Sequence, residues 1–186
     1  MRGLTIRFAV PLLLAIPIAA RGQTSFGVGT GMVSAPGAMS STSASALVGE
    51  GFVERRLNRL FSLRVDLFAT HLSMQEGGSA TPGGFTYPIY DDHLTLAAFT
   101  VGPVLYLTPV RSDTKMYVTL GLGGYEVSQD PDTPGSITKP QVTIGGGISE
   151  KMGKRTALFL EARYCALSRA PYVVRQLSGV VLGVRF

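Results

Sequence analysis

A histidine and a serine two residues apart form the pair that could do acid–base and nucleophilic chemistry. His71 and Ser73 flank Leu72. Residues two apart in a β-strand share a face, which suits a base and a nucleophile that act together on a lipid. Glu76 follows closely enough to orient the histidine. The alternative interpretation is a polar strand end that enters a loop.

A second group of chemically capable residues consists of charges spaced at even intervals. If their segments are β-strands, three acids and three bases fall on one shared face: Glu50, Arg64, Asp66, Glu161, Arg163 and Arg185. Unpaired charges in a narrow interior would be costly, so this balanced set predicts an internal network of salt bridges. The alternative is a gated path for ions.

The remaining composition offers little other chemistry. One Cys and two His leave almost nothing for a zinc site, and a single Cys excludes an intramolecular disulfide, so we expect no metal and no cofactor. Cys165 is expected to be a small buried filler. Three of the 17 Lys and Arg lie before residue 23, which leaves 14 against 12 Asp and Glu. That excess is too small to indicate nucleic acid as a partner.

The first 22 residues have the pattern of a secretory signal peptide. Arg2 and Arg7 precede the apolar run Phe8 to Ala20, and small residues occupy positions 20 and 22. A transmembrane anchor is the alternative, but the run is short of the roughly 20 residues needed to span a membrane, and Pro11 interrupts it. We therefore predict a cleaved segment 1–22 and one exported domain over 23–186.

The exported part shows period-2 alternation throughout. In Phe61 to His71, apolar residues at odd positions alternate with residues such as Arg64 and Asp66 at even positions. The pattern predicts eight strands, at 25–32, 44–54, 61–71, 94–107, 116–125, 141–150, 156–165 and 174–186. Pro103 weakens the fourth prediction, because proline cannot donate to a β-ladder.

The connections between these strands alternate in length. Short turns are expected around 55–59, 109–115 and 151–155, and longer polar connections at 34–42, 73–93, 126–139 and 166–172. Short turns at one end and long loops at the other are typical of an up-and-down barrel in an outer membrane. The sequence thus predicts an all-β, eight-stranded antiparallel transmembrane β-barrel.

The polar face argues for a membrane barrel rather than a soluble sandwich or a lipocalin-like periplasmic barrel. A soluble sandwich needs a charged outer face, whereas only 16% of this chain is charged. Small glycines dominate the polar face and are expected in a crowded lumen: Gly27, Gly29, Gly31, Gly121, Gly123, Gly145 and Gly147. Tyr87, Tyr90, Tyr106, Tyr125, Tyr164 and Tyr172 fall close to strand ends and are expected in interfacial girdles.

The last strand carries the most specific pattern in the chain. Val180, Leu182 and Val184 alternate and lead to the terminal aromatic residue Phe186. This arrangement resembles the signal that the barrel-insertion machinery reads in outer-membrane proteins.

With that strand, the chain resembles the small outer-membrane β-barrel domain family of the OmpA, OmpX and OmpW type. The resemblance extends to Leu105-Tyr106-Leu107, to residues 117–123 and 144–147, and to 160–164. It implies a barrel in the outer membrane of the Gram-negative cell envelope and says little of activity. Lipid A deacylase barrels carry a His-x-Ser-Asn motif, and the similar position here, Ala166-Leu167-Ser168-Arg169, lacks both the His and the Asn.

Three functions follow from this sequence as expectations. The first is a non-enzymatic structural or surface-interaction barrel with a lumen plugged by side chains. The alternatives are a narrow, porin-like pore for small or apolar solutes, as in OmpW-like proteins, and a lipid A-modifying enzyme. Expected partners are outer-membrane lipids, including lipopolysaccharide, and the barrel-assembly machinery, while the oligomeric state stays open. Strand parity further predicts that Val65→Arg impairs insertion more than Arg64→Gln does.

Overall fold

The computed structural model describes residues 23–35, 44–75, 91–109, 112–128, 139–168 and 176–186. The predicted signal peptide and most of the long connections lie outside these residues. The eight strands are β1 (Thr24–Ala35), β2 (Ala44–Arg56), β3 (Phe61–Gln75), β4 (Asp91–Tyr106), β5 (Thr114–Ser128), β6 (Lys139–Lys151), β7 (Ala157–Leu167) and β8 (Gln176–Arg185). Among the described residues, no helix has the length and apolar character needed to cross a membrane.

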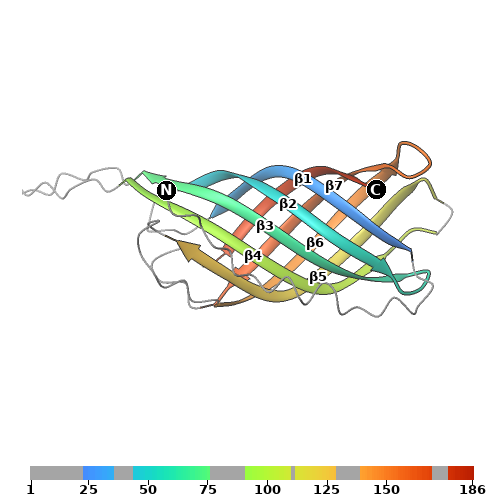
Figure 1. Cartoon of the computed structure of the whole chain (residues 1–186), viewed down its shortest axis with the longest axis horizontal. Coiled ribbons are helices and arrows are strands. Elements are labelled where there is room, and N and C mark those ends of the chain that lie inside the picture. The colour runs from blue at the N-terminus through green and yellow to red at the C-terminus, as the bar shows by residue number, and fades with distance from the viewer. Residues whose placement is uncertain (1–22, 36–43, 76–90, 110–111, 129–138, 169–175) are drawn as a thin grey trace, which may run out of the picture.

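Each strand pairs antiparallel with its neighbour in the chain, and β8 pairs with β1, so the sheet closes into a barrel. Figure 1 shows the strands winding obliquely around one axis. The turns 57–60 and 152–156 and the C-terminus lie together at its right-hand end, which we call the short-turn end. The predicted fold class is confirmed, and all eight predicted strands are present.

Alternation explains why these segments form a two-faced barrel wall. Along β3 the even-numbered residues from Ser62 to Thr70 are buried, whereas Phe61, Leu63 and Leu67 are exposed. A slip of one residue would place Arg64 and Asp66 on the outside, so the pattern fixes the register. The predicted parity of this strand is confirmed.

The outer wall is covered with exposed apolar side chains. Those at least 44% exposed on the strands include Phe26, Val28, Met32, Leu47, Leu67, Met116, Leu120, Leu122, Val142, Ile144, Ile148, Leu160, Val180 and Leu182. They come from seven of the eight strands, so the apolar surface extends around the barrel. A soluble monomer rarely exposes so much apolar surface, whereas a barrel in a bilayer requires it.

Glycines on the inner wall make room for aromatic rings. A Cβ atom at Gly27 would overlap the ring of Phe52, and one at Gly147 would lie 2.8 Å from Cζ of Tyr117. The ring of Phe159 lies against Gly183 in the same way. The expectation of glycines in a crowded lumen is confirmed, since each predicted position has neighbouring atoms where a Cβ would stand.

Two sequence expectations need correction. Tyr106 and Tyr125 are 2% and 1% exposed and point into the lumen, not into an interfacial girdle, because they share the parity of the other inward residues. Tyr164 does face outward, and Tyr87, Tyr90 and Tyr172 lie outside the described residues. Pro103 does not end β4: Leu63 of β3 lies opposite it, while the ladder to β5 omits Gly102 and Pro103.

Candidate functional site

The centre of the lumen holds an arginine surrounded by three carboxylates. Arg64 donates from Nη2 to Glu50 at 2.8 Å, from Nε to Asp66 at 2.6 Å, and from Nη1 to Glu161 at 2.7 Å. Its side chain is 2% exposed. All three nitrogens of the guanidinium group are therefore engaged by charged partners away from solvent.

A second arginine bridges the same carboxylates. Nη2 of Arg163 lies 2.8 Å from Glu50, 3.2 Å from Asp66 and 2.6 Å from Glu161. We call Glu50, Arg64, Asp66, Glu161 and Arg163 the central charge cluster. It has two positive and three negative groups, and the hydroxyl groups of Tyr117 and Thr100 donate to two of its carboxylates.

Strand register brings these five residues to one level of the barrel. Arg64 and Asp66 are two apart on β3, as Glu161 and Arg163 are on β7, so each pair shares the inner face. Opposite the β7 pair stand Gly147 and Gly145 of β6, which leave space for the long side chains. The guanidinium carbon of Arg64 lies 3.9 Å from the centroid of the Phe52 ring.

Arg185, the sixth residue expected in the network, lies apart from the other five. Its Nη2 contacts Glu54 at 2.8 Å, and it also donates to the hydroxyl groups of Tyr106 and Ser25. Arg185 is the last residue of β8, so it reaches the lumen at the short-turn end, below the central charge cluster. Sequence reasoning missed Glu54, although it shares a face with Glu50 four residues earlier.

Beyond the central charge cluster, toward the long connections, most buried side chains are apolar, with the polar Thr70, Gln141 and Thr143 among them. This outer apolar layer includes Val33, Ala35, Ala46, Val48, Leu96, Ala98, Cys165, Leu167 and Leu177, all buried. Tyr125 closes it by donating its hydroxyl hydrogen to the Ser168 carbonyl oxygen at 2.8 Å. Cys165 accepts a weak hydrogen bond from Thr143.

One small cavity lies beside the charges. A cavity of about 10 Å³ adjoins Arg64, Thr100 and Thr119. This is about the smallest volume that can hold one water molecule.

Of the three residues considered for catalysis, His71 is the one whose side chain the structure describes. His71 is exposed on the outer face, and its Nδ1 lies 3.1 Å from Oγ1 of Thr95. Glu76 and the Ser73 side chain lie outside what the structure describes. Within the described ranges, no three His, Cys, Asp or Glu residues are grouped so that they could hold a metal ion.

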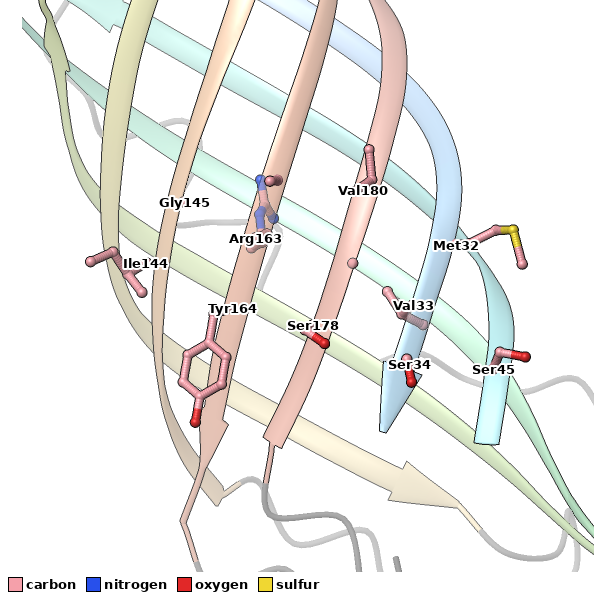
Figure 2. Close-up of a pocket in the computed structure, with 12 residues that line it drawn as sticks. Met32, Val33, Ser34, Ser45, Ile144, Gly145, Arg163, Tyr164, Ser178 and Val180 are labelled. Carbon is pink, nitrogen blue, oxygen red and sulfur yellow. The ribbon is translucent and has the colours of Figure 1, made fainter. Parts of the chain in front are cut away.

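The outer wall carries a shallow groove in the half nearer the long connections. It has a volume of about 810 Å³ and is lined by residues of β1, β2, β6, β7 and β8. Figure 2 shows Met32, Ile144 and Tyr164 along the groove, with Ser34, Ser45 and Ser178 toward the strand ends. Outward-facing side chains make up much of its lining, and Arg163 of the central charge cluster also lines it.

Comparison with known proteins gave matches in structure alone. No family model matches the chain, and no curated protein matches it. Neisserial surface protein A superposes with a TM-score of 0.65 at 16% identity, over 87% of this chain and 95% of that one. OprG from Pseudomonas aeruginosa gives 0.57 at 9% identity, over 89% and 97%. The attachment invasion locus protein Ail of Yersinia pestis gives 0.54 at 16% identity, over 90% and 100%.

These matches define the fold of the chain. It has the fold of the small eight-stranded outer-membrane barrels, the OmpA, OmpX and OmpW type that the sequence resembles. The neighbours are outer-membrane proteins of bacteria, which supports the predicted outer-membrane location. None of the three names denotes an enzyme.

Proposed function

We propose that this protein is a non-enzymatic outer-membrane barrel with a closed lumen, which acts through its membrane anchorage and its loops. The central charge cluster is the observation that carries the proposal. Five ion-paired side chains fill the middle of the barrel, and the outer apolar layer lies above them. A solute would have to separate buried ion pairs to pass, which costs several kcal/mol.

The surface-interaction part of the proposal draws on the connections and on one neighbour. Four longer connections leave the end of the barrel opposite the short-turn end. Ail, which shares the fold, is named for attachment and invasion and has been solved with the heparin analogue sucrose octasulfate. Loops on a rigid barrel are a common place for binding residues. The lipids around the apolar wall, including lipopolysaccharide, are the other partners that we propose.

Conductance in planar bilayers tests the closed lumen. We expect no channel openings from the wild-type protein. As a comparison, Arg163→Ala removes a side chain from the centre of the lumen and should give a measurable current. Steady conductance of the wild type would favour the alternative, a narrow pore.

Phe186 tests the proposed partnership with the barrel-assembly machinery. The Phe186 side chain is 58% exposed, and its backbone pairs with Phe26 of β1 in both directions. We expect Phe186→Ala to reduce the amount of assembled barrel in cells severalfold without disturbing the lumen, since the side chain lies outside it. Assembly is measured as the heat-modifiable band in outer-membrane fractions.

Asp132→Ala, in the connection between β5 and β6, is the control for that experiment. It should leave assembly unchanged. Equal assembly of the two variants would speak against Val180, Leu182, Val184 and Phe186 as a signal.

A further inference from the structure

A basic pocket opens at the short-turn end, away from the central charge cluster. It has a volume of about 720 Å³. Six of its lining residues are cationic, namely Arg56, Lys115, Lys151, Lys154, Arg155 and Arg185. The one acidic residue that lines it is Asp113, so the pocket has a large positive excess.

Internal carboxylates neutralise few of these charges. Arg185 is paired with the buried Glu54, and Lys151 lies 3.9 Å from Asp113 with both side chains exposed. Within the described ranges, no carboxylate lies within ion-pair distance of Arg56, Lys115, Lys154 or Arg155. Within those ranges, the charges of these four cations are not neutralised by an ion pair.

Two of these four cations are held in place where the pocket meets the lumen. Arg56 donates to the carbonyl oxygens of Asn58 and Arg59, and its guanidinium carbon lies 5.0 Å from the centroid of the Tyr106 ring. The ammonium nitrogen of Lys115 lies 5.8 Å from the same centroid. A site with cations already in position loses little side-chain entropy when an anion binds.

Two exposed apolar side chains lie in or beside the pocket, whose lining is otherwise mostly polar. Phe186 lines the pocket and is 58% exposed, and Met152, in the same turn as Lys154, is also exposed. A free anion gains nothing from these side chains, whereas an amphiphile with an anionic head and apolar chains contacts both parts. Phosphate is the anion that clustered Arg and Lys donors bind best.

From these features we infer that the pocket binds the phosphate headgroup of an anionic phospholipid. The lipid would belong to the leaflet that surrounds the short-turn end. The inference rests on the proposed membrane location. It adds a bound ligand and a second charged site to a barrel whose proposed role otherwise lies at its opposite end.

Native mass spectrometry of the detergent-purified protein tests this inference. The probes are dioleoylphosphatidylglycerol, dioleoylphosphatidylcholine and inorganic phosphate, each titrated separately and in competition. We expect the wild type to bind one phosphatidylglycerol at least tenfold more tightly than phosphatidylcholine. Each cation near a lipid surface contributes about fivefold in affinity, so Lys154→Gln/Arg155→Gln should weaken phosphatidylglycerol binding by about twentyfold.

The matched control removes two cations from the same end but outside the pocket. Arg55→Gln/Arg59→Gln should change the affinity less than threefold, while Lys115→Gln, deeper in the pocket, should cost about fivefold. Equal losses in the two double variants would overturn the site, because they would show a general charge effect. Equal affinity of the wild type for the two lipids would also overturn it. Displacement of the lipid by inorganic phosphate at the same concentration would overturn the assignment to lipid in favour of the free ion.

The experiment distinguishes a failure of the lipid-binding inference from a failure of the proposed membrane location. Insertion of the wild type into phosphatidylcholine vesicles, detected by heat-modifiable migration, is measured first. Failure at that step contradicts the membrane location, whereas a loss of lipid preference in a properly inserted barrel contradicts the pocket alone.

Discussion

Replacing Arg64 with Gln is expected to destabilise the folded barrel by about 3–5 kcal/mol, the cost of leaving buried charge without its partner. Arg64 contacts all three carboxylates of the central charge cluster, and Arg163 alone would have to balance them. The free energy of unfolding is measured by urea titration in phosphatidylcholine vesicles. The chain has no Trp, so circular dichroism and the heat-modifiable band replace tryptophan fluorescence.

A charge-balanced double variant serves as the control for Arg64→Gln. Arg64→Gln/Asp66→Asn removes one carboxylate together with the arginine, so it should recover a large part of the lost stability. If adding Asp66→Asn lowers the stability of the Arg64→Gln variant further, the two residues do not act as a pair. If the Arg64→Gln variant were as stable as the wild type, the central charge cluster would not contribute to the stability of the barrel.

Introducing an arginine at position 65 is expected to cost about 2–4 kcal/mol in the same titration, because the side chain would enter hydrocarbon near the middle of the wall. Val65 faces outward between Val53 of β2 and Val101 of β4. A large part of the Val65→Arg protein should fail to insert into vesicles, as detected by the loss of the heat-modifiable band.

The control for Val65→Arg depends on depth. Leu107 is 58% exposed, directly after β4 at the short-turn end, where an arginine reaches the lipid headgroups. Leu107→Arg should therefore cost no more than about 1 kcal/mol. Equal effects at the two positions would mean that Val65 does not face the membrane core.

The expected order of these two effects changes once the contacts are known. Parity alone makes Arg64→Gln the milder change, because it identifies an inward arginine without showing how many partners it has. Three short ion pairs on one guanidinium group raise the expected cost to at least that of Val65→Arg.

Alternation was sufficient to predict the strands and their faces because both depend on neighbours within one segment. The inward positions of Arg64, Glu161 and Cys165 follow from parity alone. Tyr106 and Tyr125 could have been placed in the lumen by the same rule, since Tyr125 has the parity of Gly121 and Gly123. For these two tyrosines, proximity to a strand end predicted the position of the side chain less well than parity did.

Depth along the barrel axis could not be predicted in this way. Which inward charges meet depends on the register between strands that are distant in the sequence, such as β2 and β8. Glu54 and Glu50 share one face of β2, yet Glu54 pairs with Arg185 and Glu50 with Arg64 and Arg163. The separate Arg185 pair therefore emerged from the three-dimensional structure.

The burial of Cys165 has a consequence for the redox chemistry of an exported chain. This thiol is the single one in the sequence, and in the folded barrel it is 4% exposed among apolar neighbours. During transit through an oxidising compartment the unfolded chain would present it to thiol reagents and to other chains. Closure of the barrel ends that exposure. The rate at which the thiol becomes unreactive therefore measures the rate at which the barrel folds.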